Sequence, residues 1–236
     1  MGERVALITA ASRGIGAACA RALARQGYKI SLMSRSAEVL ALAGELGGYA
    51  IQGSVINNVD LERFVRSTMN TYGRIDAVVN NTGDPSRGNL LEITDQTWLS
   101  DVELILLNVI RMCRLVTPIM IAQGSGAFVN ISAADAYEPD ARFPIGSTLR
   151  AALGAWSKLY AREYAARAIR MNCVLPGIIL PASSRPVRGD IMREVPMQRA
   201  GEYEEIADVV SYLLSDQASY VTGQSIRADG GLTKSF

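Results

Sequence analysis

The sequence predicts a single doubly wound α/β domain over residues 1–236, built on a parallel sheet of about seven strands with helices on both faces. Short apolar runs rich in valine and isoleucine alternate with segments of helical periodicity from one end of the chain to the other. This alternation favours a parallel sheet whose strands are joined by right-handed crossovers. The sequence shows no linker, repeat or low-complexity tract that would divide the chain.

The expected strands are apolar runs typical of a buried sheet. They span residues 4–10, 29–35, 49–55, 75–83, 126–133, 169–177 and 225–231. Residues 14–27 and 57–75 have the period of helices, and Gly27 and Gly73 stand where a helix commonly ends. Residues 143–159 begin another amphipathic helix, for which Ser147 has the side chain of an N-cap.

Composition and charge exclude several classes of protein. The net charge is +1 without a basic block, so we expect no nucleic-acid partner. No apolar run has the length of a membrane span and no signal peptide begins the chain, so we expect a cytoplasmic protein without a membrane partner. Cys19, Cys113 and Cys173 lie far apart, which favours buried free thiols over disulfides or a metal site. The chain has no histidine, which removes Ser-His-Asp and Cys-His catalysis.

A glycine-rich turn follows the first expected strand. Gly14 and Gly16 open the helix that comes next, so the backbone there can approach a phosphate, whose charge the helix N-terminus stabilises. Glycines that merely pack a helix on a strand would have the same pattern. The position after the first strand of a doubly wound sheet favours dinucleotide binding.

Several motifs in the same order resemble the classical branch of the short-chain dehydrogenase/reductase family. Residues 9–16 resemble its Thr-Gly-x-x-x-Gly-x-Gly motif with Ala10 in place of the first glycine, and residues 80–83 resemble its Asn-Asn-Ala-Gly. Pro176-Gly177 and residues 220–231 match two further motifs. The resemblance implies a Rossmann-like fold, a nicotinamide cofactor, a small-molecule substrate and a homotetramer or homodimer. The residues it places at the cofactor are Thr9, Ala11, Ser12, Arg13, Gly14, Ile15, Gly16, Arg35, Ser54, Val55, Asn81, Thr82, Gly83, Arg150, Pro176, Gly177 and Ile179.

The end of the second expected strand indicates which nicotinamide cofactor is used. A carboxylate there favours NAD, whereas arginine favours the 2′-phosphate of NADP. This chain has Ser34, Arg35 and Ser36, and Arg13 of the glycine-rich turn can approach the same phosphate. We therefore predict NADP(H), although both arginines could also be ordinary surface residues. Ser54 stands where the family often has an aspartate that contacts adenine.

The family's Ser-Tyr-Lys catalytic set is degenerate in this chain. The resemblance places the serine at Ala133, the tyrosine at Gly146 and the lysine at Arg150, while Asn108 matches the family's asparagine. Glycine supplies no proton and should leave a space beside Arg150, and arginine stays charged. Loss of a positioned general acid typically lowers the rate about 100- to 10,000-fold.

Three interpretations of this loss remain open. The protein could reduce a small carbonyl, imine or activated alkene with a non-standard proton donor. Ser132, Asp135 and Tyr137 are the leading candidates, with Asp84, Ser147 and Thr148 as others. It could instead be a catalytically inactive NADP-binding subunit or regulator, or catalyse a non-redox elimination or isomerisation.

Residues 179–201 should cover the substrate, according to the same resemblance. Pro181 stands where a threonine often contacts the cofactor carboxamide. Arg185, Arg188 and Arg193 could meet an anionic substrate or be exposed arginines of the covering segment.

Overall fold

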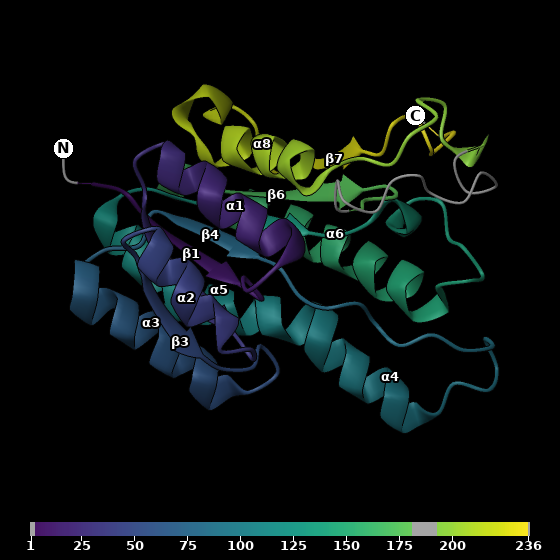
Figure 1. The fold of residues 1–236 in the computed structure, drawn as a ribbon, viewed down its shortest axis with the longest axis horizontal. Coiled ribbons are helices and arrows are strands. Elements are labelled where there is room, and N and C mark those ends of the chain that lie inside the picture. The colour runs from purple at the N-terminus through teal and green to yellow at the C-terminus, as the bar shows by residue number, and fades with distance from the viewer. Residues whose placement is uncertain (1–2, 181–192, 236) are drawn as a thin grey trace.

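The structure, a computed structural model, describes residues 3–180 and 193–235 and contains one seven-stranded sheet (Figure 1). All neighbouring strands are parallel, in the order β3-β2-β1-β4-β5-β6-β7. The predicted fold class is confirmed. The strands are β1 (Val5–Thr9), β2 (Lys29–Ser34), β3 (Tyr49–Gln52), β4 (Ala77–Asn80), β5 (Gly126–Ile131), β6 (Ile169–Pro176) and β7 (Ser225–Ala228).

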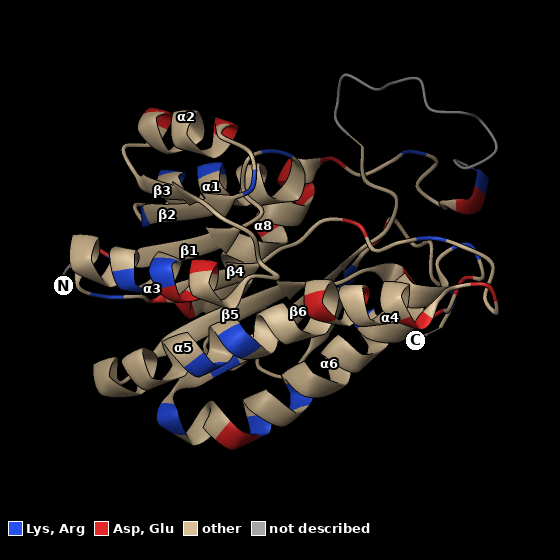
Figure 2. Ribbon diagram, turned by 90° about the horizontal axis from the view of Figure 1, so that it is seen from below, with Lys and Arg blue, Asp and Glu red and all other residues tan. Residues whose placement is uncertain are grey.

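Helices cover both faces of the sheet (Figure 2). One face packs against α1 (Gly14–Arg25), α2 (Glu38–Glu45) and α8 (Tyr203–Leu214). The other face packs against α3 (Asn58–Tyr72), α5 (Asn108–Gln123) and α6 (Pro144–Tyr164). Shorter elements are α4 (Asp95–Val102), the π-helical η1 (Glu103–Leu107), and the 3-10 turns η2 (Ala134–Ala136), η3 (Ala165–Arg167) and η5 (Asp216–Ala218).

Strand β1 shows why its sequence is apolar throughout. Ala6 and Ile8 lie in the core beneath α1 and α8, whereas Val5 and Leu7 lie in the core on the opposite face. Successive side chains of a strand point to opposite faces, so a strand between two helical layers needs apolar residues at every position.

The helix ends confirm one prediction and correct another. Gly73 takes a left-handed φ of 73° and ends α3, as predicted. Ser147, however, is not an N-cap, because α6 already begins at Pro144 with Phe143 as the flanking residue. The ring of Pro144 fixes φ near the helical value and suits the first helical position, which moves the helix start four residues earlier. Ser147 therefore lies within α6, and its side chain is buried.

One helical run corrects the expectation about membrane spans. The continuous helix Asp95–Gln123 is long and apolar enough to cross a membrane by length and composition alone, with an 18-residue stretch of mean hydropathy 1.8. In this fold, Val109, Met112 and Val116 of that run are buried against the sheet. The core helix of a globular domain meets the same criterion, so the run is weak evidence for a membrane span.

The sheet order reverses between β1 and β4, and this reversal positions the site. The chain runs outward from β1 through β2 to β3, then crosses to β4 on the other side of β1. The loops that follow β1 and β4 therefore diverge at the carboxyl edge of the sheet and leave a crevice, where ligands of such folds bind.

Candidate active site

A cavity of about 1050 Å³ opens at the carboxyl edge of the sheet. It is lined by the turns and loops that follow β1 to β6, together with α6 and the start of α8. The residues that were predicted to bind the cofactor and line this cavity are Ser12, Arg13, Gly14, Ile15, Arg35, Ser54, Val55, Asn81, Thr82, Gly83, Arg150, Pro176, Gly177 and Ile179. Thr9, Ala11 and Gly16 are buried behind the lining.

The buried residues of the glycine-rich turn hold its shape. Thr9 Oγ1 donates to the carbonyl of Asn81 at 2.7 Å, and Asn81 Nδ2 donates to the carbonyl of Ala10 at 3.2 Å. A Cβ on Gly16 would lie 2.6 Å from that Ala10 oxygen, so only glycine fits. Ala10 itself, at the family's first glycine position, takes a left-handed φ of 47°.

The end of β2 joins the glycine-rich turn to a polar wall of the cavity. Arg13 and Arg35 are exposed there, and Ser34 Oγ donates to Ser12 Oγ at 3.0 Å. Glu38 opens α2 and accepts a hydrogen bond from Ser36 Oγ at 2.9 Å. This carboxylate also lines the cavity and was missed in the sequence, because it lies three residues beyond Arg35 in the next element.

At Ser54, where the family often has an aspartate, the structure has a different arrangement. The backbone N–H of Ser54 donates to Asp60 Oδ2 of α3 at 2.9 Å, and Asp60 Oδ1 pairs with Arg63 at 2.9 Å. The carboxylate nearest to this position thus comes from the following helix and is already engaged by the chain.

Other lining residues are not among those predicted to bind the cofactor. They are Ala10, Ser34, Ser36, Glu38, Gly53, Ile56, Leu104, Ile131 and Tyr203. Tyr203, the first residue of α8, lies 3.8 Å from the place that a Cβ on Gly14 would take. Its ring therefore lies beside the glycine-rich turn. Only the packing of α8 against α1 brings these distant segments together.

The other end of the cavity contains Arg150, which is 8% exposed on α6. Its Nη1 donates to the carbonyls of Ile131 at 3.2 Å and Ser132 at 2.5 Å, at the end of β5. Burial lowers the pKa of the Arg150 guanidinium, while the negative charges of Asp135 and Asp84 oppose this shift. The guanidinium is nevertheless charged at physiological pH.

The space expected beside Arg150 is partly filled, which corrects that expectation. A Cβ on Gly146 would lie 3.2 Å from Asp135 Oδ2 and 3.2 Å from Pro85 Cγ. The absence of a side chain at position 146 therefore lets the carboxyl group of Asp135 and the ring of Pro85 approach α6.

The Asp135 carboxyl group is held in place from one side only. Ser147 Oγ donates to Asp135 Oδ2 at 3.3 Å and accepts the backbone N–H of Asp140 at 3.1 Å. Asp135 Oδ1 is buried without a hydrogen-bond partner among the described residues. Burial raises the pKa of Asp135, outweighing the positive charge of Arg150 and the hydrogen bond from Ser147. A raised pKa makes this carboxyl group a candidate proton donor.

The remaining candidates lie in different surroundings. Ser132 is 3% exposed, and its Oγ has no partner within the described part of the chain. Tyr137 is 52% exposed, lies under the guanidinium of Arg227 at 5.0 Å, and borders a second cavity of about 230 Å³. Asn108 is buried after the π-helical turn and donates through Nδ2 to the carbonyl of Leu104.

The other residues singled out in the sequence also lie in different surroundings. Asp84 is exposed and lines the large cavity. Thr148 is exposed and donates to the carbonyl of Pro144 at 2.9 Å. Pro181, Arg185 and Arg188 lie outside the described residues.

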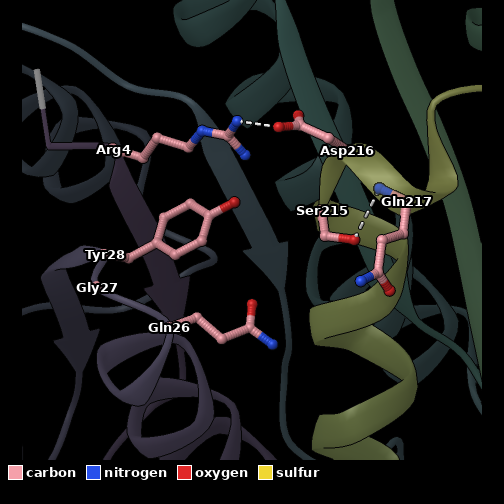
Figure 3. A pocket seen from close by; sticks show the side chains of 7 residues that line it. All are labelled: Arg4, Gln26, Gly27, Tyr28, Ser215, Asp216 and Gln217. Carbon is pink, nitrogen blue, oxygen red and sulfur yellow. Dashed lines mark hydrogen bonds and ion pairs between the residues drawn. The ribbon is translucent and has the colours of Figure 1, made fainter. Parts of the chain in front are cut away.

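A third cavity, of about 380 Å³, lies at the opposite edge of the sheet (Figure 3). Arg4, Gln26 and Tyr28 face Ser215, Asp216 and Gln217 across it, and Arg4 forms an ion pair with Asp216. None of the residues that the sequence predicts for cofactor binding or catalysis lines this cavity.

The fold and the large cavity together define the class of protein. A parallel doubly wound sheet, a glycine-rich turn at its reversal point and arginines at the end of β2 are the features of an oxidoreductase domain that binds a dinucleotide.

Comparison with known proteins identifies the family. The family model described as enoyl-(acyl carrier protein) reductase matches residues 9–233. The 3-oxoacyl-[acyl-carrier-protein] reductase FabG of Staphylococcus epidermidis is 32% identical, over 98% of this chain and 99% of that protein. The human dehydrogenase/reductase SDR family member 4 is 33% identical, over 98% of this chain and 88% of that protein. The chain therefore belongs to the short-chain dehydrogenase/reductase family.

A solved structure extends the likeness to the whole fold. The crystal structure of YwfH, an NADPH-dependent reductase involved in bacilysin biosynthesis, superposes with a TM-score of 0.93 at 25% identity and covers 100% of both chains. The predicted cofactor, NADP(H), agrees with the NADPH dependence of that neighbour.

Proposed function

We propose that the protein is an NADP(H)-dependent reductase of a small carbonyl, imine or activated-alkene compound, with Asp135 as the proton donor. The observation that carries this proposal is the approach of Asp135 Oδ2 to within 3.2 Å of the place of a Gly146 Cβ. A carboxyl group of raised pKa thus lies at the root of the space that the family's tyrosine fills.

The chain's own groups divide the work at this end of the cavity. Asp135 Oδ2 is the oxygen that approaches Gly146, so we place the transferable proton on Oδ2, beside the hydroxyl of Ser147. When that proton leaves, the O–H of Ser147 and the charge of Arg150 stabilise the carboxylate that remains. Arg150 also places a positive charge where negative charge develops on a reduced substrate.

The described residues fit NADP(H). Gly14 lines the cavity at the positive end of α1, and Arg13 and Arg35 offer guanidinium groups to a 2′-phosphate. Thr82 Oγ1 is buried in the cavity wall without a partner in the described segments, as expected for a group that contacts a ligand. When bound, the cofactor supplies the hydride of the reduction.

One observation favours the alternative of an inactive NADP-binding subunit. Asp135 does not line the large cavity in this conformation, and Ala133 and Gly146 offer no other proton. The two functions differ in turnover but share cofactor binding.

Cofactor binding and turnover are therefore measured separately. Fluorescence titration with NADPH and NADH should show binding of NADPH, and NADPH oxidation should be followed over a panel of ketones, imines and enones. We expect turnover that Asp135→Asn abolishes and that the matched control Asp95→Asn, at an exposed carboxylate in the first turn of α4, retains. Binding without turnover would support the inactive subunit, and failure to bind either nucleotide would contradict both functions. Product formation without NADPH oxidation would indicate a non-redox reaction.

We further propose a homotetramer or homodimer that acts in the cytoplasm. Large apolar side chains remain exposed on the long helices of the monomer, with Leu99 at 61%, Ile121 at 38% and Leu159 at 64%. Exposed apolar side chains of this kind suit burial against a second subunit. Light scattering after size-exclusion chromatography tests the assembly, and a monomer at micromolar concentration would contradict it.

A further inference from the structure

We infer that the substrate carries a carboxylate group, which binds to Arg150 and Ser132. This inference rests on the proposed function in using the same cavity, and it names the substrate class that the cavity accepts.

The first observation is a buried charge without a contacting carboxylate. Arg150 is more than nine-tenths buried, and within residues 3–180 and 193–235 no carboxylate lies within ion-pair distance of it. A buried charge without a partner is strongly unfavourable, and proteins keep such charges paired. An anionic group that enters with the ligand would supply the missing partner.

The second observation concerns unused hydrogen-bond donors. Only Nη1 of Arg150 is engaged, by the backbone carbonyls of Ile131 and Ser132. The hydrogen bonds of Arg150 to described residues come from Nη1 alone, which leaves Nη2 and Nε available. The hydroxyl of Ser132 beside it is buried without a partner among the described residues. A guanidinium edge and a hydroxyl group match the oxygens of one carboxylate.

The third observation is the space around these donors. Arg150 and Ser132 line both the large cavity and the cavity of about 230 Å³ behind it. Small side chains of α6 border the second cavity, namely Ala151, Gly154 and Ala155. The two cavities leave room for an anion beside Arg150 and Ser132. The donors of these two side chains are sufficient for the two oxygens of a planar carboxylate.

Two carboxyl groups act on the charge of Arg150 without contacting it. Asp84 lines the same large cavity and Asp135 lies on the neighbouring turn. Asp135 has a raised pKa and, in its protonated form, leaves the positive charge of Arg150 available. A neutral ketone would leave this charge unmatched.

Two probes with the same ketone separate the effect of the carboxylate. Benzoylformate carries a carboxylate beside its carbonyl, and methyl benzoylformate carries an ester there. Isothermal titration calorimetry on the protein saturated with NADP⁺ measures their binding without turnover, because the oxidised cofactor has no hydride to give. We expect benzoylformate to bind at least about 10-fold more tightly than its ester. Equal affinities, or tighter binding of the ester, would overturn the inference.

Variants assign the preference to the two residues. Arg150→Met should abolish the preference for benzoylformate, and Ser132→Ala should weaken benzoylformate binding about 5- to 10-fold while leaving the ester unchanged. Circular dichroism and NADP⁺ titration establish that each variant folds and binds cofactor. If Arg150→Met does not fold, Ser132→Ala alone decides the outcome.

A matched control lies at another arginine. Arg87 lies over the ring of Phe143 at 4.6 Å and is exposed, and Arg87→Met should keep the preference. Loss of the preference in Arg87→Met, or its survival in Arg150→Met, would overturn the inference. Asp135→Asn should also keep it, so a failure of the proposed proton donor is distinguishable from a failure of the carboxylate site.

Discussion

Two arginines at opposite edges of the sheet differ in how fully their donors are used. At the amino edge, Arg170 donates to the carbonyls of Leu213 at 2.6 Å, Val221 at 3.3 Å and Ser215 at 3.1 Å. At the carboxyl edge, Arg150 uses one nitrogen, and buried atoms of Thr82, Ser132 and Asp135 lack partners among the described residues.

This difference separates stability from function. Arg170 satisfies the carbonyls at the end of α8, where the helix dipole also favours a cation. Polar groups left unpaired at the carboxyl edge lower the stability of the protein without ligand, so a folded chain retains them where a ligand uses them. The comparison therefore predicts that substitutions at one edge change stability and that substitutions at the other change activity.

The largest expected effect is on catalysis at Asp135. Asp135→Asn should lower kcat for reduction about 100- to 10,000-fold, because the amide cannot donate an acidic proton. The same variant should raise the thermal unfolding midpoint of the unliganded protein at pH 8, since it removes a carboxylate that burial destabilises. Differential scanning fluorimetry and steady-state kinetics check the two halves, and a variant that loses stability with activity would contradict a separate catalytic role.

The pH dependence of the reaction follows from the same group. Burial raises the pKa of Asp135 against the charge of Arg150 and the hydrogen bond of Ser147, with Asp140 acting in the same direction as burial. The group must be protonated to act, so the wild-type rate of reduction should fall as pH rises through this raised pKa. The kcat of Asp135→Glu should show the same fall with rising pH. A wild-type kcat that does not change with pH would contradict Asp135 as the proton donor.

The amino edge should show the largest effect on stability. Arg170→Met removes three hydrogen bonds from a guanidinium and leaves the carbonyl of Leu213 without a donor, so it should lower the free energy of unfolding by about 2–4 kcal/mol. Arg150→Met at the carboxyl edge should change it by less than about 1 kcal/mol, because it removes an unpaired buried charge along with the hydrogen bonds. Urea unfolding followed by circular dichroism measures both, and equal losses would contradict the contrast between the two edges.

The local patterns of the sequence were sufficient for the fold and much of the cofactor cavity. Continuous apolar strands and helix-ending glycines act within a few residues, so the element order was predictable. The position of Asp135 beside Gly146 was not, because the turn η2 and the start of α6 meet only through tertiary packing. Ser147 was misinterpreted for a related reason, since Pro144 sets the helix start and frees the hydroxyl to reach Asp135.

Cofactor selectivity should depend on Arg35 at the carboxyl edge. Arg35→Ala should weaken NADPH binding about 10- to 100-fold and leave NADH binding nearly unchanged, because only NADPH carries the 2′-phosphate. Arg25, an arginine at the end of α1, provides the control, and Arg25→Ala should affect neither nucleotide. Fluorescence titration with both nucleotides measures the effect, and an equal loss for NADPH and NADH would contradict the role of Arg35.

The smallest expected effect tests backbone strain at both edges with the same substitution. Ala10 has a φ of 47° at the carboxyl edge, and Ala168 has a φ of 56° just before β6 at the amino edge. Each alanine lies in the left-handed region, which is unfavourable for a residue with a Cβ, so Ala10→Gly and Ala168→Gly should each stabilise the protein by about 0.5–1 kcal/mol. Only Ala10→Gly should also change NADPH affinity, because Ala10 belongs to the phosphate turn and its carbonyl accepts the hydrogen bond of Asn81. A change of NADPH affinity in Ala168→Gly would show that the two edges are coupled and would contradict their separation.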